Sequence, residues 1–203
     1  MYRLRRGLRN WGLGLCGFAF ILGCGSTSPV QYYQLSAMPN SVTEETSPRA
    51  EKGTVVGIGP IDIPSYVDRA HLVIRTDISQ LEVLESDRWA EPLQKNLARV
   101  LIDNLSQELA SHGINVLRWD EGLPNDYRVR VEFTQFDILK TGEVSLVARW
   151  IIFGKDGQEA LIIKTSRFHT SSVPGDYRSL VSEMSRHVES LSQEIANALS
   201  ATF

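Results

Sequence analysis

The spacing of hydrophobic residues changes several times along this chain, and each spacing predicts a different kind of element. Between residues 54 and 168, short apolar or alternating runs predominate, and these are typical of β-strands. Tyr127–Phe136 alternates most strictly, with Tyr127, Val129, Val131 and Phe133 on one side and mainly charged residues on the other. Strands are predicted at residues 54–63, 71–76, 80–85, 114–117, 127–136, 143–153 and 160–168.

Two longer segments instead place hydrophobic residues every three or four positions, which predicts amphipathic helices. The first runs from Glu91 to Ser111, with Pro92 in its first turn and a stop at His112-Gly113. The second follows Asp176, a good N-cap residue, and continues almost to the C-terminus. Together the elements predict an α+β fold, in which a mostly antiparallel β-sheet is packed on one face by two long α-helices.

The first 23 residues have a different character, because four arginines precede an apolar run from Trp11 to Gly23. The run contains 13 residues, whereas a membrane-spanning helix needs about 20. A basic stretch followed by a short apolar run is typical of a cleaved secretory signal peptide. We therefore assign residues 1–23 to a signal peptide.

The signal ends in Ile21-Leu22-Gly23-Cys24, which resembles the bacterial lipobox. A small residue before the cysteine permits cleavage there, and the thiol of Cys24 receives a diacylglyceryl group. Cys16 is the alternative cysteine, but it follows the bulky Leu15. We therefore expect Cys24 to be the lipidation site, with acyl chains such as palmitate, and this covalent lipid to be the only bound group.

Residues 24–53 are rich in Ser, Thr, Pro and Glu, a composition that predicts a lipidated tether or flexible linker. One island, Tyr32-Tyr33-Gln34-Leu35, has strand-like character and is predicted to pair briefly with the sheet. Residues 54–203 then form a single domain, a length that suffices for one hydrophobic core.

Cleavage of the signal also changes the charge and the cysteine count. Losing four arginines leaves 17 basic against 24 acidic side chains, which moves the net charge from −3 to −7. Such an acidic chain is poorly suited to nucleic acid, whose binding depends on neutralising phosphates. Because Cys24 is consumed by lipid, no disulfide is expected.

The residue after Cys24 indicates which membrane holds the protein. Gly25 stands where an aspartate would favour retention in the inner membrane, so we expect the protein at the periplasmic face of the outer membrane.

No pattern of catalytic or metal-binding residues is found in the sequence. The four histidines stand singly, without a second ligand at metal-binding spacing. Gly57-Ile58-Gly59 is followed by Pro60 and lacks the third glycine and the helix start of a phosphate-binding loop. We therefore expect neither an enzyme nor a metal or organic cofactor, although a hydrolase assembled from distant residues is a third alternative.

The predicted strand Glu143–Phe153 is apolar on both faces, although only one face can pack on the helices. Strands of this kind are usually covered on both sides. A loop or the Tyr32-Tyr33 segment could cover the second face. The other hypothesis is a partner or self-assembly surface, whose residues would be Val147, Arg149, Ile151 and Phe153.

Several stretches together resemble the PqiC/YmbA-like lipoproteins, which are auxiliary components of ABC-type lipid transport systems. They are the lipobox at Cys24, the island at Tyr32–Leu35, the run VGIGPIDIPSYVDRAHLVIRT from Val56 to Thr76, and LEVLESDRWAEPLQKNLARVLIDNL from Leu81 to Leu105. None of these motifs is catalytic, and the resemblance depends on their combination and order.

The resemblance implies an outer-membrane lipoprotein that docks a periplasm-spanning MCE-domain transport protein and supports envelope integrity. Its implied partners are that MCE protein and outer-membrane lipids, and the second apolar face of Glu143–Phe153 adds self-assembly as a separate hypothesis. An alternative function is a periplasm-facing lipoprotein that binds lipid in a cavity of its own and shuttles it. An enclosed apolar cavity beneath the helices would favour the alternative.

Overall fold

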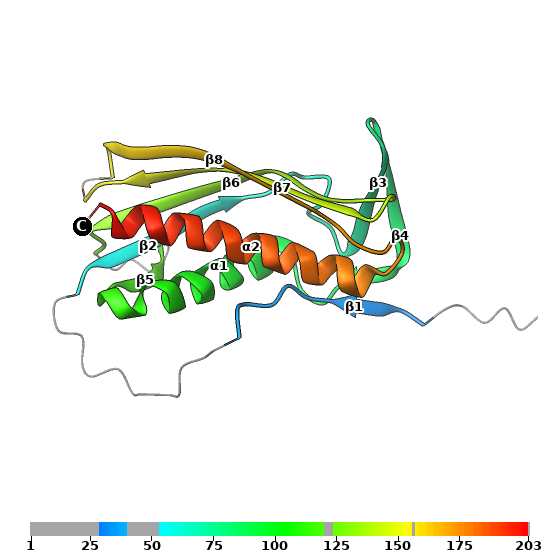
Figure 1. Cartoon of the computed structure of the whole chain (residues 1–203), viewed down its shortest axis with the longest axis horizontal. Coiled ribbons are helices and arrows are strands. Elements are labelled where there is room, and N and C mark those ends of the chain that lie inside the picture. The colour runs from blue at the N-terminus through cyan, green and yellow to red at the C-terminus, as the bar shows by residue number, and fades with distance from the viewer. Residues whose placement is uncertain (1–28, 40–52, 120–123, 156, 203) are drawn as a thin grey trace, which may run out of the picture.

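The computed structural model describes residues 29–39, 53–119, 124–155 and 157–202. Its strands are β1 (Gln31–Tyr33), β2 (Val55–Asp62), β3 (His71–Asp77), β4 (Gln80–Trp89), β5 (Asn115–Arg118), β6 (Tyr127–Leu139), β7 (Glu143–Phe153) and β8 (Ala160–Ser171). Its helices are α1 (Leu93–Leu109), a 3-10 turn at Ala110–His112, and α2 (Tyr177–Ser200). The strands join in one sheet (Figure 1).

The long strand β6 organises this sheet. One edge of β6 pairs with β7 over almost its whole length, and β7 in turn pairs with β8. The other edge of β6 pairs first with β2, which carries β5, and then with β3, which leads through β4 to β1. Most paired residues lie in the antiparallel ladders β3–β4, β6–β7 and β7–β8, whereas the four parallel pairings are short. The predicted α+β class with a mostly antiparallel sheet is confirmed.

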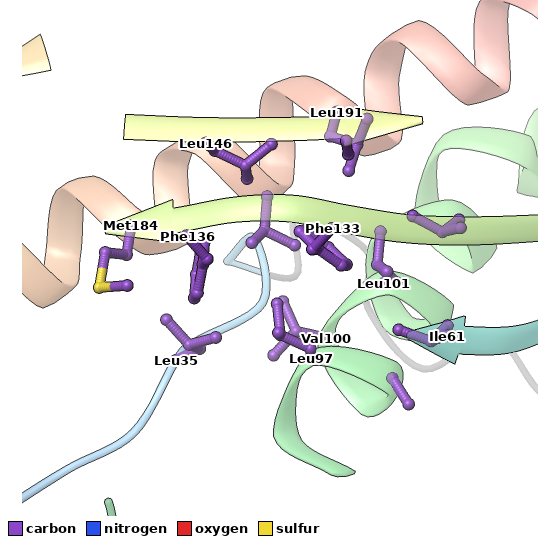
Figure 2. Packing of buried hydrophobic residues seen from close by; sticks show 14 of the residues in the cluster. Leu35, Ile61, Leu97, Val100, Leu101, Phe133, Phe136, Leu146, Met184 and Leu191 are labelled. Carbon is purple, nitrogen blue, oxygen red and sulfur yellow. The ribbon is translucent and has the colours of Figure 1, made fainter. Parts of the chain in front are cut away.

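Both helices lie against the same face of the sheet (Figure 1). Each long strand directs alternate side chains towards them, as its period of two requires. The core combines these side chains with one stripe from each helix, and Figure 2 shows Phe133 and Phe136 of β6 facing Leu97 and Leu101 of α1. None of the helices in the described ranges is long and apolar enough to cross a membrane.

The helix ends and the hairpin mostly follow the predicted local signals. Gly113 adopts a left-handed conformation with φ of 66° and ends the 3-10 turn that follows α1. The carboxylate of Asp176 accepts a hydrogen bond from the backbone N–H of Ser179 and so caps α2. Gly157, with φ of 67°, lies in the tight connection between β7 and β8.

Several boundaries differ from the prediction. β4 continues to Trp89, because its last residues pair with β1 and with His71 of β3. Pro92 is therefore the N-cap residue of α1, with an extended ψ of 125°, and the helix begins at Leu93 rather than at Glu91. β6 and β8 each extend three residues further than predicted, because their ends still find partners in the sheet.

Candidate functional site

The N-terminal arm, defined as residues 29–39, is the part of the described chain that lies nearest in sequence to the predicted lipidation site. Cys24 itself and the signal peptide at residues 1–23 lie outside the described residues. The arm starts with β1, which pairs in parallel with the end of β4, and the carbonyl of Tyr33 accepts a hydrogen bond from the N–H of Ala90. The predicted pairing of the tyrosine island with the sheet is confirmed for Tyr32 and Tyr33.

The side chain of Tyr33 strengthens this attachment. Its hydroxyl donates a hydrogen bond of 2.8 Å to the carboxylate of Asp87, across the β1–β4 pair. Burial and this hydrogen bond raise the pKa of Tyr33 to about 12, so the donor proton is retained throughout the physiological range. The start of the arm is thus fixed to the sheet by both backbone and side chain.

After β1 the arm leaves the sheet and is held by the helices. Asn96 of α1 accepts a hydrogen bond from the N–H of Leu35 at 2.7 Å and donates one to its carbonyl at 3.2 Å. Two turns further along α1, Asn104 accepts from the N–H of Met38, and Gln107 donates to the Met38 carbonyl. These amide side chains satisfy backbone groups that would otherwise be buried without partners.

The arm also contacts α2 and contributes to the core. Ser185 of α2 accepts a hydrogen bond from the N–H of Ser36, and Asn104 donates weakly to Ser192 of α2 at 3.4 Å. The side chain of Leu35 is 0% exposed. Figure 2 shows it pointing into the cluster formed by residues of the sheet and both helices. Residues 29–39 are therefore held on the domain, although they belong to the stretch that composition assigns to a linker.

Neither Asn96 nor Asn104 was identified from the sequence as functionally relevant. Both lie within the apolar stripe of α1, beside Leu97, Leu101 and Leu105, and both are buried. An asparagine in such a stripe needs a polar partner, because burying an unpaired amide is costly. That conflict between residue type and position is the signal that could have indicated a docked segment.

Replacing Asn96 with alanine is expected to loosen the arm. The N–H and carbonyl of Leu35 would lose their partners, at a cost of about 1–3 kcal/mol of unfolding free energy. Urea unfolding measures the loss, and hydrogen exchange at Leu35 shows whether it is local. The control is Asn197→Ala, which removes an exposed asparagine of α2 and should stay within about 0.5 kcal/mol of the parent. Equal effects of the two substitutions would contradict the clamp.

The second face of β7 carries the predicted partner or self-assembly surface. Val147, Ile151 and Phe153 are half-buried there, and Arg149 is exposed. The Tyr32-Tyr33 segment does not cover this face, because it pairs with β4 at the far margin of the sheet. The apolar side chains are shielded mainly by their neighbours across the ladders, as Ile151 is paired with Arg130 on β6 and Ile163 on β8.

Ion pairs divide this face into small apolar areas. The guanidinium of Arg149 contacts the carboxylate of Glu132 at 2.5 Å, and Arg130 contacts Asp62 at 3.0 Å. Both pairs are substantially exposed, so each contributes at most about 1 kcal/mol to stability. Beside them, Ile151 of β7 is paired across the ladder with Ile163 of β8, which is 66% exposed. The face therefore has the mixed composition of a non-obligate interface.

One end of the same face is closed by the loop between β2 and β3. Its Tyr66 donates a hydrogen bond to Asp137 at 2.7 Å, and Arg75 donates to the same carboxylate at 2.8 Å. Gln135 also donates to Asp137, which is only 2% exposed. Burial and the bond to Asp137 raise the pKa of Tyr66 to about 12. A loop thus covers one end of the face, as one sequence alternative proposed, and leaves the β7 residues uncovered.

Two of the four histidines, His187 and His169, have polar partners in the structure. His187 of α2 is buried and bonds to Thr170, and burial lowers its pKa. His169 contacts Glu143 at the surface. His71 begins β3 and His112 follows α1, apart from that pair. No group of three or more metal-ligand side chains occurs within the described ranges.

The cavities bear on the lipid-shuttle alternative. A hollow of about 370 Å³ lies at the surface where β2, α1 and the end of β5 meet, lined among others by Ile61, Lys95 and Trp119. It lies at the margin of the sheet. Between the helices and the sheet, large side chains such as Trp150 and Phe133 are fully buried in one continuous cluster. That region is packed with side chains.

Comparison with known proteins identifies related sequences along most of the chain. A sequence model described as the ABC-type transport auxiliary lipoprotein component matches residues 33–196, from the arm into α2. The intermembrane transport lipoprotein PqiC of Escherichia coli (strain K12) is 25% identical over 193 residues, which cover 93% of this chain and 98% of that protein. The PqiC of Shigella flexneri matches with the same identity and coverage.

Solved structures resemble the fold at lower identity. A crystal structure of an uncharacterised protein has a TM-score of 0.69 at 22% identity and covers 84% of this chain and 99% of its own. The crystal structure of protein XCC0632 from Xanthomonas campestris has a TM-score of 0.63 at 14% identity, with coverages of 85% and 100%. These two similarities concern the fold alone.

Proposed function

The chain belongs to the family of ABC-type transport auxiliary lipoprotein components, and from that premise we propose that it tethers a lipid transport assembly to a membrane. In detail, the acyl chains on Cys24 hold it at the periplasmic face of the outer membrane. The folded domain docks a periplasm-spanning MCE-domain protein and thereby supports envelope integrity. The family consists of transport auxiliaries rather than enzymes, and a tether requires no chemical step.

The observation that carries this proposal is the attachment of the arm. Few residues separate Cys24 from β1, and from β1 onward the chain is bonded to β4, to α1 and to α2. A domain held in this way stays close to the membrane that contains its lipid. The relative whose name describes an intermembrane transport lipoprotein supports the same role. The packed core beneath the helices gives no comparable support to the lipid-shuttle alternative.

The outer face of β7 is the docking surface that we propose, for the MCE protein or for a further copy of this chain. Its residues are Val147, Arg149, Ile151 and Phe153. Half-buried apolar side chains next to Arg149 provide both the apolar area and the charged group that interfaces favour. The long β8 beside it extends this surface through Ile163.

Introducing lysine at both Val147 and Ile151 is expected to abolish capture of the MCE partner or self-association, because two charges would have to be desolvated on binding. Native mass spectrometry of the delipidated domain, with and without the MCE protein, measures both. The control variant carries lysine in place of Gln193 and Asn197, two exposed positions of α2. Circular dichroism verifies folding. Unchanged association in the folded β7 variant would refute this docking surface and leave the lipid anchor untouched.

A further inference from the structure

Exposed hydrophobic side chains gather at one end of the molecule. Among the described residues, nine large hydrophobic side chains are exposed. Six of them belong to the arm, to the β3–β4 hairpin or to the loop before α2: Val30, Tyr32, Ile78, Leu81, Val83 and Val173. Figure 1 shows β1, β3 and β4 together at the end opposite the last turn of α2. The accumulation at one end is the observation that needs an explanation.

Backbone pairings connect these segments to one another. The N–H of Lys140, just after β6, donates to the carbonyl of Arg75 on β3, and the N–H of Ser172 donates to Gly142 in the turn between β6 and β7. The loop containing Val173 is thereby placed next to the β3–β4 hairpin. The other partner of β4 is β1, at which the arm begins.

The hairpin turn that exposes Ile78 is held firmly. Ile78 is 90% exposed, yet its N–H donates to the carboxylate of Asp77 and its carbonyl accepts from Arg75. Thr76 donates across the turn to the carbonyl of Gln80. In Figure 1 the hairpin stands out from the body of the sheet. An isoleucine at the tip of a well-bonded, projecting turn is suited to contact an apolar surface, and Leu81 and Val83 continue its apolar side.

The direction of the arm indicates which surface that is. Because β1 and β4 are parallel, the chain enters β1 from the direction in which β4 starts, and Gln31 pairs with Asp87, seven residues after Gln80 at the hairpin turn. Six residue steps separate Cys24 from Val30, and at most about 3.6 Å per step gives a reach of roughly 20 Å. The membrane that holds the lipid is therefore close to the hairpin end of the domain.

We propose that the β3–β4 hairpin tip, with Ile78, Leu81 and Val83, rests on the lipid bilayer in which the acyl chains of Cys24 are embedded. This inference depends on the proposed lipid anchor and adds a second, non-covalent contact. Two contacts restrict how the domain can rotate relative to the membrane, whereas a tether alone limits only its distance. The outer face of β7 is then held within a narrower range of directions relative to the membrane.

The chemistry of the tip identifies the part of the bilayer that it contacts. Asp77, Glu82 and Glu85 lie on the same hairpin and oppose attraction to anionic headgroups. The contact is therefore an insertion of apolar side chains at the interface between headgroups and acyl chains, and it does not require anionic lipid. Alone, so small an apolar area binds weakly, but the anchor keeps the tip at a high effective concentration beside the membrane.

The test places an environment-sensitive fluorophore on the hairpin of the full mature lipoprotein. Cys16 is lost when the signal peptide is cleaved, and the thiol of Cys24 is acylated. The substitution Ile78→Cys therefore provides the only reactive thiol of the mature protein. After reconstitution into vesicles of phosphatidylethanolamine and phosphatidylglycerol, we expect the label to shift to shorter wavelength and to lose its quenching by iodide. Asn197→Cys is the control, because it labels an exposed position near the end of α2, at the end of the domain opposite the hairpin. Its label should remain quenched.

The outcomes separate this inference from the anchor on which it depends. If the lipoprotein floats with the vesicles while both labels stay equally quenched, the seating of the hairpin is wrong and the anchor stands. If the protein is not acylated and does not float, the anchor and the seating fail together. The label at position 78 could also be shielded from iodide in detergent, where no vesicles are present. That result would indicate a protein partner or a second copy at the tip, and it would also overturn the proposal.

Discussion

Replacing Cys24 with alanine is expected to release the protein from membranes almost completely. Each buried methylene of an acyl chain contributes about 0.8 kcal/mol, and one chain alone gives only marginal binding, so two or three chains make the attachment effectively permanent. Without the thiol no chain is attached, and the hairpin contact alone is too small to compensate. Sedimentation and flotation of the expressed chain measure the fraction that remains bound.

The chain contains its own control for this experiment. Cys16 lies in the same apolar run, but Leu15 precedes it, so Cys16→Ala should leave lipidation and membrane binding intact. Circular dichroism of the released Cys24→Ala domain should match that of the lipidated protein. If that variant stayed in the membrane fraction and supported the envelope normally, the tether model would be wrong.

The second large effect is expected for Leu35→Ala. The side chain is 0% exposed and fills a position in the core from a segment outside the sheet and the helices. Removing three buried carbons and leaving a cavity costs about 2–5 kcal/mol. The arm can also detach from the domain as a unit. The loss in unfolding free energy caused by Leu35→Ala therefore cannot exceed the free energy with which the arm is bound to the rest of the domain.

Urea unfolding of Leu35→Ala measures the total loss, and protease sensitivity of the arm measures detachment. Val30→Ala is the matched control, since it shortens an exposed side chain of the same arm and should change stability by less than about 0.5 kcal/mol. A Leu35→Ala protein as stable as the Val30→Ala protein would show that the arm is not part of the folded core.

Much of the fold could be predicted from local patterns. The alternation in Tyr127–Phe136, the apolar stripes of the two helices and the cap at Asp176 each depend on neighbouring residues alone. The true end of β4 could not be predicted, because Asp87 to Trp89 are extended by pairing with β1, which lies far away in the sequence. The outward turn of Gln135 and Asp137 follows a bulge after Phe133 that has no turn residue to mark it.

The candidate site likewise has a part that local patterns predict and a part that depends on residues far apart in the sequence. Cys24 was assigned from local chemistry, and that assignment stays a prediction because the residue lies outside the described ranges. The docking of the arm depends on Asn96 and Asn104 meeting backbone groups about sixty residues earlier, which no local pattern predicts. The sequence left open whether the Tyr32-Tyr33 segment covers the outer face of β7, and the pairing of β1 with β4 shows that it does not.

The parallel pairing of β1 with β4 has a mechanical consequence. In the proposed tether, a force that separates the two membranes would act through the lipid on the N-terminal end of β1 and would pull the arm along that strand. The hydrogen bonds of the β1–β4 ladder then lie across the pulling direction and bear the load together in shear. Behind them, the amide bonds of Asn96 and Asn104 carry the load into α1. Detaching the arm along this axis would therefore require the ladder bonds to break together rather than one after another.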